Sequence, residues 1–291
     1  MGGVVRTMPP FVDVIVVVDD ASRDETSAVV QAVGDPRVDL VVHAENQGVG
    51  GSLIDAHLRA IHAEADISVV MGGDGQMDPA YLPALLDPIV EEHVDFTKGN
   101  RFFDVGTWQG MPRHRVFGNI VLTFLTKTAT GYWNLVDPQN GYTAMGRRVQ
   151  RSIDWSRIAR DYSFENDVLA QLGLLRARIR DIDIPALYGE EVSGIKLRAV
   201  VPSLLRTLIR ASMRRFWLSY MLRSFSPVAL FVLTGVPMLL WAIGYGGWVV
   251  WATRGPAAAT TGTVMLAVLP FLLGFQLILA AFVIDIVNTP K

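Results

Sequence analysis

The feature that most constrains this sequence is a pair of long apolar runs near its C-terminus. Residues 225–251 (FSPVALFVLTGVPMLLWAIGYGGWVVW) and 261–284 (TGTVMLAVLPFLLGFQLILAAFVI) contain no charged side chain. Each run is longer than the roughly 20 residues that a helix needs to cross about 30 Å of hydrocarbon. The sequence therefore predicts a membrane region over 225–287 with two transmembrane helices, at about 225–251 and 261–286. The alternative interpretation is a buried helical hairpin in a soluble domain.

A basic segment precedes the first apolar run. Residues 196–224 hold seven Lys and Arg side chains and no carboxylate, whereas residues 1–195 carry a formal charge of −10, from 17 Lys and Arg against 27 Asp and Glu. The segment mixes its cations with Leu, Ile, Phe and Trp, which is typical of helices that lie in the headgroup plane of an anionic membrane. No nucleic-acid partner is expected, because the large domain is acidic and the basic segment adjoins the apolar runs.

The distribution of cations also predicts how the chain is oriented. The connector between the apolar runs, residues 252–260, has only Arg254, so the positive-inside rule places the basic segment, the large domain and the C-terminus in the cytoplasm. The start has no positively charged stretch followed by an apolar one, so we expect no signal peptide. The sequence thus predicts a multi-pass protein of the cell membrane. The absence of cysteine excludes disulfides and thiolate metal sites.

Residues 1–195 alternate between strand and helix patterns and form the expected cytoplasmic domain. Runs rich in β-branched residues indicate strands at 12–20, 38–44, 67–74 and 95–102, and helical spacing indicates helices at 24–33, 51–65 and 79–93. This rhythm with short connections predicts an α/β fold with a doubly wound, mostly parallel sheet. The carboxyl ends of its strands share one edge, where we expect Asp19, Asp20, Asp74, Asp78 and Arg101.

A glycine-rich turn with acidic and amide side chains follows the third strand. In GGDGQMDP (72–79), Asp74, Gln76 and Asp78 offer the oxygen ligands that Mg²⁺ or Mn²⁺ prefers. We therefore expect a divalent cation at this turn, with Asp74 as its main ligand. Asp78 has a second interpretation, because it precedes Pro79 and can cap the N-terminus of the following helix.

Another glycine-rich segment, NQGVGG (46–51), precedes the second helix. One interpretation is a cradle for a phosphate at the helix start. The segment lacks the Gly-Lys-Ser/Thr ending of a P-loop, however, so a simple turn is an equal alternative.

Six segments stand in the order that characterises one enzyme family: VDDASRDET (18–26), NQGVGG (46–51), MGGDGQMDP (71–79), KGNRF (98–102), DPQNGYTAMGRR (137–148) and SFENDV (163–168). The chain resembles the family 2 glycosyltransferases over nearly its whole length. It is most similar to the branch that makes polyprenyl-phosphate sugars, the dolichol-phosphate mannosyltransferase-like enzymes with a two-helix C-terminal anchor. The resemblance implies a GT-A-like fold, Mg²⁺ or Mn²⁺ as cofactor, and inverting transfer of a hexose. The donor would be a nucleotide-diphosphate sugar of the UDP-glucose or GDP-mannose type, and the acceptor a polyprenyl phosphate.

The resemblance also implies roles for individual residues. Asp19 and Asp20 match a strand-end pair that contacts the base and ribose of the donor. Asp74 and Gln76 match the metal motif of the family. Gly72 stands where that motif usually has a first Asp, so metal binding rests on Asp74 with Gln76 and the donor diphosphate.

The remaining matches lie near the sugar and the acceptor in the implied site. Arg101 matches the arginine of a Gly-Ser-Arg turn, and Arg115 with Asn119 matches an Arg-x-x-x-Asn pattern. Asp137 and Gln139 match a loop that faces the sugar. Glu165 and Asp167 match an acidic pair near the acceptor and the metal. Each of two residues also has a simpler interpretation without a role in the site. In this interpretation Arg115 forms only an ion pair with a carboxylate on the surface. Independently, Asp167 only caps or solvates a helix.

The sequence departs from the family at its start. Family members begin with a strand that reads approximately V-x-I-P-A-Y-N-E and forms one wall of the nucleotide pocket, whereas residues 1–20 begin within the first helix. The lacking strand is expected to lie centrally in the sheet. Without it, the neighbouring strands would have unpaired backbone N–H and C=O groups, and half of the donor site would be exposed.

This departure, together with Gly72, leaves an alternative function open. The alternative is a non-catalytic, membrane-anchored protein that binds nucleotide sugars or acts as a scaffold. An enzyme that transfers sugar to a different membrane acceptor is a third hypothesis. A homo-oligomer is compatible with the sequence.

Overall fold

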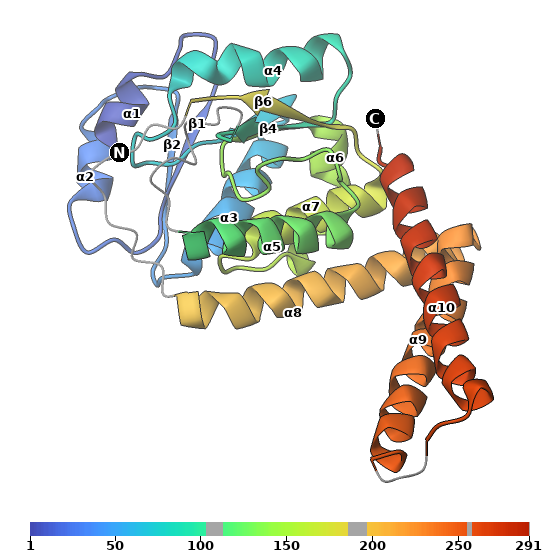
Figure 1. The fold of residues 1–291 in the computed structure, drawn as a ribbon. Coiled ribbons are helices and arrows are strands. Elements are labelled where there is room, and N and C mark those ends of the chain that lie inside the picture. Colours follow the sequence, from blue (N-terminus) through green and yellow to red (C-terminus); the bar gives the residue numbers. More distant parts are fainter. Residues whose placement is uncertain (103–112, 186–196, 255–257, 291) are drawn as a thin grey trace. The chain divides into compact units, whose positions relative to one another are not determined.

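Figure 1 shows the fold in a computed structural model, which describes residues 1–102, 113–185, 197–254 and 258–290. The chain forms two compact units, Met1–Ser212 and Met213–Thr289. The first unit contains the described strands and the helices that cover them. The second contains two long helices.

The strands of the first unit form two sheets. In the smaller sheet, β1 (Ile15–Asp19) pairs in parallel with β2 (Val38–Val42). The larger sheet has the order β3-β5-β4-β6, built from β3 (Ile67–Val70), β4 (Phe96–Asn100), β5 (Thr143–Gly146) and β6 (Ile179–Asp183). β5 runs antiparallel to β3 and β4, and β4 is parallel to β6. β3, β4 and β6 therefore end at the same edge.

Helices flank both sheets of the first unit (Figure 1). They are α1 (Gly2–Arg6), α2 (Thr26–Gln31), α3 (Gly48–His62), the 3₁₀ turn η1 (Pro79–Tyr81), α4 (Leu82–Glu91), α5 (Arg113–Thr130), α6 (Arg147–Ser152), η3 (Trp155–Arg157), α7 (Phe164–Leu175) and α8 (Leu197–Arg215), whose end passes into the second unit. The strands and helices predicted from periodicity up to residue 102 are present, with ends that shift by a few residues. β5 and β6 were not predicted.

The expected α/β fold with mostly parallel strands is confirmed, but the sheet is divided in two. Among the strands that the structure describes, β1 hydrogen-bonds to β2 and β3 hydrogen-bonds to β5. β1 and β3 therefore belong to separate sheets. Met8 and Val12, which precede β1, pack against the buried cluster that includes Ile15 and Val17 of β1 and against the one that includes Ala144 of β5.

The largest apolar core packs against β4, β5 and β6. Phe96 of β4, Met145 of β5 and Ile179 of β6 project into it, and Ile54 of α3 and Leu169 of α7 meet them there. Burial of such side chains is the main favourable term in folding. β4, β5 and β6 are therefore anchored on a packed layer.

α8 packs on the first unit through one helical face. Leu204, Leu208 and Ala211 of α8 form a buried cluster with Ala129 of α5 and Ala170 of α7. Their spacing of four and three residues is that of one side of a helix. The compact unit thus extends past the predicted boundary at residue 195 and includes most of α8.

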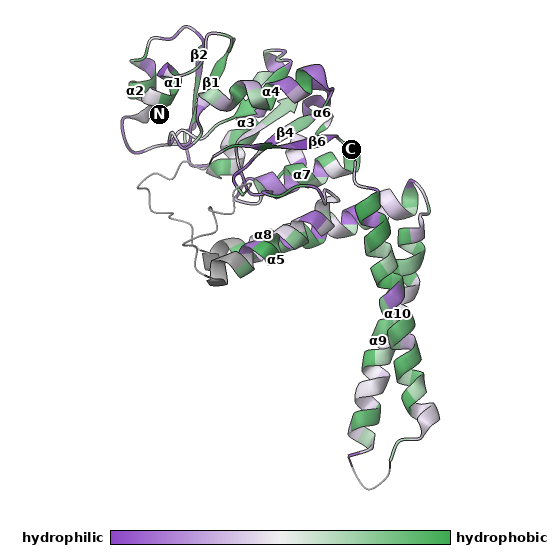
Figure 2. Ribbon diagram, turned by 45° about the horizontal axis from the view of Figure 1, so that its top comes forward, coloured by the Kyte–Doolittle hydropathy of each residue, from purple (hydrophilic) through white to green (hydrophobic). Residues whose placement is uncertain are grey.

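The second unit is a hairpin of α9 (Pro227–Ala252) and α10 (Thr261–Val287). Both helices are long and apolar enough to cross a membrane, with best 18-residue mean hydropathies of 2.0 and 2.5. Figure 2 shows hydrophobic residues along most of their length. Most residues of both segments are exposed, which argues against the interpretation as a hairpin buried in a soluble core.

Small residues let the two apolar helices approach each other closely. A Cβ at Gly235 would lie 3.1 Å from the carbonyl oxygen of Gly274, and a Cβ at Gly274 would lie 2.9 Å from that of Gly235. Helices in membranes associate through such small residues, because lipid offers no hydrophobic driving force between them. This contact fixes how α9 and α10 pack on each other.

A buried ion pair lies within the second unit. Arg215 donates to both carboxylate oxygens of Asp285, which is the only charged residue of α10. Tyr220, in the π-helix η4 (Phe216–Leu222), also donates to Asp285. A buried carboxylate needs such partners. The contact therefore joins η4 to the last turns of α10.

Candidate active site

The turn after β3 presents the predicted metal ligands. Asp74 and Gln76 are exposed, and one carboxylate oxygen of Asp74 accepts the backbone N–H of Gln76 at 3.0 Å. A Cβ at Gly72 would lie 2.9 Å from that oxygen. Asp78 caps the turn η1, because its Oδ1 accepts the backbone N–H of Ala80 at 2.8 Å. The capping interpretation of Asp78 is thus confirmed.

Arg101 and Asp137 form an ion pair beyond the end of β4. Arg101 Nε lies 2.8 Å from one carboxylate oxygen of Asp137, and Arg101 Nη2 lies 3.2 Å from the other. The Asp137 side chain is 1% exposed, whereas that of Arg101 is 36% exposed. A guanidinium in this geometry neutralises a buried carboxylate and still presents N–H donors towards an anionic substrate.

The loop before β5 adjoins the turn after β3. The hydroxyl of Tyr142 donates to the backbone carbonyl of Asp78 at 2.9 Å. A Cβ at Gly141 would lie 3.4 Å from Met77 Cε and 4.0 Å from Glu165 Oε1. The structure therefore brings together the predicted metal-binding turn, the loop before β5 and the carboxylate of Glu165.

Glu165 and Asp167 lie in the first turn of α7 but in different surroundings. Burial raises the pKa of Glu165, and the charge of Lys98 acts in the opposite direction. Asp167 accepts a backbone N–H of the loop before α7 at 3.0 Å, so it ties that loop to the helix. Between them, Asn166 exchanges side-chain hydrogen bonds with Gln139 at 3.1 and 3.3 Å. Gln139 is thereby held towards α7.

Arg115 and Asn119 lie on α5, one helical turn apart. The side chain of Arg115 lies outside the described residues, so its role stays a prediction. α5 itself is connected to the site, because the Thr126 hydroxyl donates to Asn166 at 3.0 Å.

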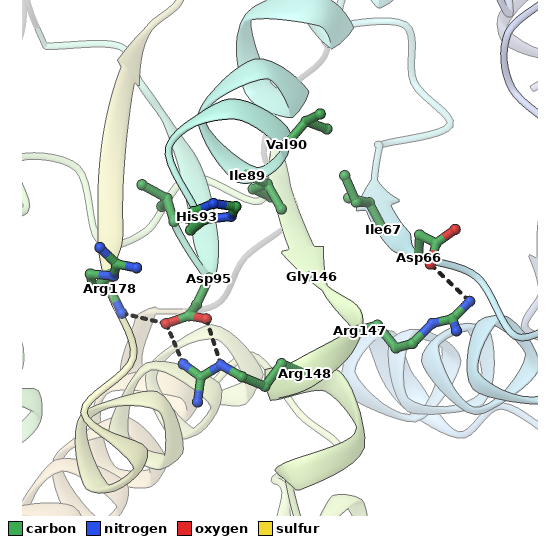
Figure 3. Close-up of a pocket in the computed structure, with 11 residues that line it drawn as sticks. Asp66, Ile67, Ile89, Val90, His93, Asp95, Gly146, Arg147, Arg148 and Arg178 are labelled. Atoms are coloured by element: carbon green, nitrogen blue, oxygen red, sulfur yellow. Dashed lines mark hydrogen bonds and ion pairs between the residues drawn. The ribbon is translucent and has the colours of Figure 1, made fainter.

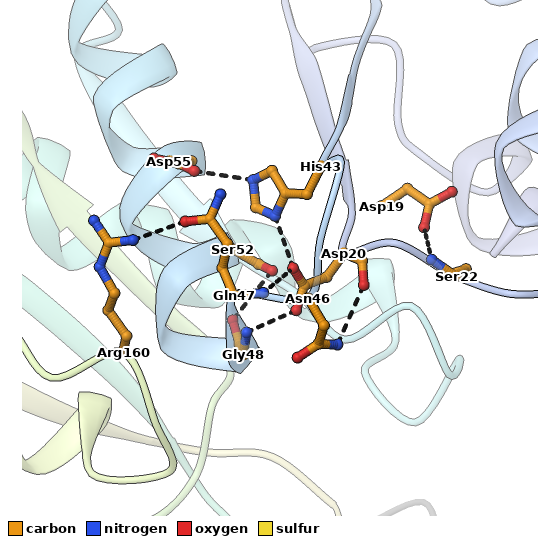
Figure 4. A network of polar contacts seen from close by, with 10 residues as sticks. All are labelled: Asp19, Asp20, Ser22, His43, Asn46, Gln47, Gly48, Ser52, Asp55 and Arg160. Atoms are coloured by element: carbon orange, nitrogen blue, oxygen red, sulfur yellow. Dashed lines mark hydrogen bonds and ion pairs between the residues drawn. The ribbon is translucent and has the colours of Figure 1, made fainter.

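The acidic pair at the end of β1 is hydrogen-bonded within the protein (Figure 4). Asp19 accepts the backbone N–H of Ser22 at 2.9 Å and the hydroxyl of Ser27, and the hydrogen bonds from the Ser22 and Ser27 side chains lower its pKa. Asp20 accepts two backbone N–H groups at the start of α3, each at 2.8 Å. Both carboxylates thus hold the segments around β1, and their contact with the donor stays a prediction.

His43 connects Asp20 to α3 (Figure 4). Its Nδ1 lies 2.7 Å from the Asp20 carboxylate, and its Nε2 lies 2.9 Å from that of Asp55. The hydrogen bond to Asp20 raises the pKa of this buried histidine, and Asp55 adds to the effect. The network therefore favours a charged imidazole that fixes the start of α3 against the end of β1.

The segment NQGVGG (46–51) packs against neighbouring backbone. Gly48 has a φ of +84°, a conformation that glycine adopts readily. Two N–H groups of the segment donate to Asp20, and the N–H of Gly51 donates to the carbonyl of Arg160 at 3.2 Å. Because these N–H groups already have partners, the structure favours the turn interpretation over a phosphate cradle.

We expect Gly50→Ala to destabilise the protein. A Cβ at Gly50 would lie 2.5 Å from the carbonyl oxygen of Ala159 and 2.6 Å from the carbonyl carbon of Arg160, so α3 would have to shift. Overpacking of this kind costs about 1–3 kcal/mol, measurable as a lower urea midpoint of the detergent-solubilised protein. Gly118→Ala is the matched control, because a Cβ at this helical position meets nothing within 4 Å in the described structure. Equal destabilisation by both changes would contradict the close contact.

A cavity of about 500 Å³ opens at the other edge of the larger sheet (Figure 3). It is lined by residues around the starts of β3 and β4 and the end of β5. Arg147 pairs there with Asp66 at 2.9 Å, and Arg148 pairs with Asp95 at 2.5 Å. Two of its arginines are thus already neutralised, and the cavity is separate from the candidate site.

Residues 5–153 match the model of glycosyl transferase family 2. The chain belongs to this family. The match spans the turn after β3, Arg101 and Asp137, and it confirms that the chain is a glycosyltransferase. The family predicted from the order of the sequence motifs is therefore correct.

Two curated relatives of this glycosyltransferase carry names that specify a lipid phosphate. The chain is 26% identical over 192 residues to a UDP-N-acetylglucosamine–dolichyl-phosphate N-acetylglucosaminyltransferase from Methanococcus voltae, covering 61% of this chain and 76% of the relative. It is 30% identical over 195 residues to an undecaprenyl-phosphate mannosyltransferase from Micrococcus luteus, covering 66% and 78%.

Solved structures confirm the GT-A-like fold of the glycosyltransferase. Glucosyl-3-phosphoglycerate synthase from Mycobacterium tuberculosis, in complex with Mn²⁺, UDP-glucose and phosphoglyceric acid, superposes with a TM-score of 0.58 at 19% identity, covering 73% of this chain and 74% of its own. Mannosyl-3-phosphoglycerate synthase from Rubrobacter xylanophilus superposes with a TM-score of 0.53 at 18% identity, covering 77% and 72%.

Sequence reasoning did not single out one buried charge of the glycosyltransferase. Lys98 on β4 is 1% exposed, and its ammonium donates to the backbone carbonyl of Asn140 in the loop before β5. A single lysine in a strand usually projects into solvent, so its type alone carries no signal. The register of β4 against its neighbours is needed to find it.

Proposed function

We propose that this glycosyltransferase transfers a hexose from a nucleotide-diphosphate sugar to a polyprenyl phosphate, with inversion at the anomeric carbon. The observation that carries the proposal is an exposed apolar surface on the unit that holds the site. This surface is formed by α5 and α8, which lie side by side (Figures 1 and 2). An acceptor dissolved in water needs no such surface, whereas a polyprenyl phosphate lies in a membrane.

The apolar surface consists of large side chains at helical spacing. They include Phe117, Ile120 and Phe124 on α5 and Val201, Leu205 and Ile209 on α8, with exposures between 40% and 69%. Arg206 and Arg210 are exposed between the apolar positions of α8. Amphipathic helices of this composition bind anionic lipid surfaces, and each cation near the surface contributes about 1 kcal/mol. The anionic membrane surface is therefore part of the proposal.

The names of the relatives support the same acceptor. One is named as a dolichyl-phosphate enzyme and the other as an undecaprenyl-phosphate enzyme. The solved neighbours are named for 3-phosphoglycerate, but at 18–19% identity they establish the fold alone. We therefore favour the polyprenyl phosphate.

Asp74 and Gln76 would hold Mg²⁺ or Mn²⁺. An exposed carboxylate and an amide oxygen on a glycine-rich turn are suitable ligands for a hard divalent cation. Among the residues that the structure describes, no three His, Cys, Asp or Glu side chains form a metal cluster, so the donor diphosphate and water would complete the coordination. When bound, the cation neutralises charge on the departing nucleoside diphosphate.

The side chains of the site would align the two substrates. A polyprenyl phosphate is already anionic at neutral pH, so its oxygen attacks the anomeric carbon without a strong general base. The bond from that carbon to the diphosphate breaks as the new bond forms on the opposite face, which inverts the centre. Arg101, held by Asp137, would bind the acceptor phosphate, and Glu165 would face the sugar and acceptor. Alignment of this kind can supply about 7–11 kcal/mol.

The proposed function is tested with the full chain in nanodiscs that contain anionic lipid. Labelled UDP-glucose, GDP-mannose and UDP-N-acetylglucosamine are each offered with undecaprenyl phosphate or with 3-phosphoglycerate, in the presence of Mn²⁺. We expect label in the organic phase with undecaprenyl phosphate only. Transfer to 3-phosphoglycerate alone would contradict the proposal. Donor binding in calorimetry without transfer to either acceptor would favour a binding or scaffold protein.

We also propose that the enzyme lies in the cell membrane with its site in the cytoplasm. Residues 196–224 carry seven cations, whereas the connector between α9 and α10 carries only Arg254. The chain has no cysteine, so Ala258→Cys and Lys291→Cys each create a single labelling site. In intact cells, an impermeant thiol reagent should label the connector variant and spare the C-terminal one. Labelling of Lys291→Cys before lysis would contradict this topology.

A further inference from the structure

Lys98 is a fully buried lysine in the middle of β4. Its neighbours across the larger sheet are Thr143 of β5 and Asp181 of β6. Phe96, two residues earlier, projects into the core against α7, so Lys98 lies on that same face of the sheet. Paired residues on adjacent strands share a face, which brings Asp181 beside Lys98. A buried ammonium is unfavourable unless other groups bond to it or neutralise it. The groups that interact with Lys98 therefore indicate what its side chain stabilises.

The ammonium of Lys98 holds the loop before β5. It donates to the backbone carbonyl of Asn140. The side-chain amide of Asn140 donates to the carbonyl of Gly99 at 2.7 Å, and its Oδ1 accepts the backbone N–H of Tyr142 at 3.0 Å. The two side chains thus tie the loop to β4 at several points. The same loop carries Asp137 of the candidate site.

Carboxylates from three different segments interact electrostatically with this ammonium. The charged groups that interact with Lys98 are Asp137, Glu165, Asp181 and Arg101, and Lys127 of α5 faces Asp181. One oxygen of Asp181 accepts a backbone N–H at 2.6 Å, and the other has no hydrogen-bond partner among the described residues. Lys98, Arg101 and Lys127 therefore supply three cations against three carboxylates, and loss of Lys98 would leave buried negative charge uncompensated.

Burial acts on both signs of charge in this cluster. It lowers the pKa of Lys98, raises the pKa of Glu165, and raises the pKa of Asp181 to about 6. Attraction between the ammonium and the carboxylates opposes all three shifts, so the ionised forms stabilise one another. Loss of the ammonium would raise the pKa of Glu165 further.

We propose that Lys98 is a positioning residue of the transferase, whose ammonium holds the 137–141 loop and the Glu165 carboxylate in the arrangement that transfer requires. Lys98 is too deeply buried to touch a substrate, so it acts through these groups. The inference rests on the proposed function, which places Asp137 and Glu165 beside the sugar and the acceptor.

The test compares Lys98→Met with the wild-type protein in nanodiscs, using a donor and undecaprenyl phosphate. We expect kcat to fall about 10-fold near pH 7, while KM for the nucleotide sugar changes less than about threefold. The acid limb of the kcat–pH profile should move up by about one pH unit, because the Glu165 carboxylate without the ammonium ionises only at higher pH. Activity should therefore recover towards alkaline pH. Lys98→Arg keeps the charge and should restore the position of the acid limb.

Lys127→Met is the matched control, since it removes another lysine that faces Asp181 and leaves the loop contacts intact. Its acid limb should stay at the wild-type position. If Lys98→Met does not fold, Lys98→Met with Asp181→Asn removes charge of both signs and is measured in the same way. If Lys98→Met kept the wild-type kcat and the wild-type acid limb, only the role of Lys98 would be overturned. The same conclusion would follow if its loss of activity were no larger than its loss of folded protein. Absence of transfer by the wild-type protein would instead overturn the proposed function.

Discussion

Replacing Asp74 by alanine is expected to slow sugar transfer by about 10²–10³-fold, a typical cost of removing a group that stabilises developing charge. Asp74 is the only carboxylate between residues 71 and 77, because Gly72 stands at the other position of the metal motif. The protein thus offers the cation one carboxylate at this turn. The measurements are the rate of lipid-linked sugar formation at saturating Mn²⁺ and, independently, the binding of the nucleoside diphosphate with and without Mn²⁺.

Asp78→Ser is the matched control for this prediction. It removes a carboxylate four residues away and keeps a hydroxyl that can cap η1 through the N–H of Ala80. We expect its transfer rate and its Mn²⁺-dependent binding to stay close to those of the wild-type protein. Full activity of Asp74→Ala, or of the wild-type protein in EDTA, would contradict a metal-dependent mechanism.

The fold could be predicted where hydrophobic periodicity is strong. The β-branched runs of β1, β2 and β3 and the spacing of α3 and α4 are local signals, and these elements are present. β5 is different, because Thr143–Gly146 has only four residues, two of them small, and becomes a strand through pairing with β3 and β4. Such non-local pairing leaves little trace in a short stretch of sequence.

Much of the candidate site could be predicted from the order of the motifs, but not the partners of each side chain. Asp74 and Arg101 lie on turns at strand ends, as expected. Asp20, by contrast, is bonded to His43 and to the start of α3, contacts between residues far apart in the sequence. The position of Lys98 beside Asp181 follows from the register of β4 against β6, which the sequence alone does not show. Local patterns locate an edge of a sheet, whereas tertiary packing decides which charges are paired there.

Replacing Arg101 by glutamine is expected to have two separable effects. Transfer should fall by about 10²–10³-fold, because the guanidinium is the cation proposed to bind the acceptor phosphate. Stability should fall by about 1–3 kcal/mol, because the change leaves the buried carboxylate of Asp137 without its bidentate partner. Adding Asp137→Asn removes the unpaired charge, so the double variant should regain stability without regaining transfer. The measurements are urea midpoints and kcat/KM.

The pair of Arg148 and Asp95 provides the matched control at the other edge of the sheet. It is likewise an arginine held by a poorly exposed carboxylate, with Arg148 Nε 2.9 Å from Asp95 Oδ1. Arg148→Gln should therefore lower stability in the same direction and leave kcat/KM unchanged, because no substrate is proposed to reach it. If the double variant of Arg101 and Asp137 regained transfer together with stability, Arg101 would be only a structural partner of Asp137. The acceptor phosphate would then need a different cation, and Arg115 of α5 would become the next residue to test.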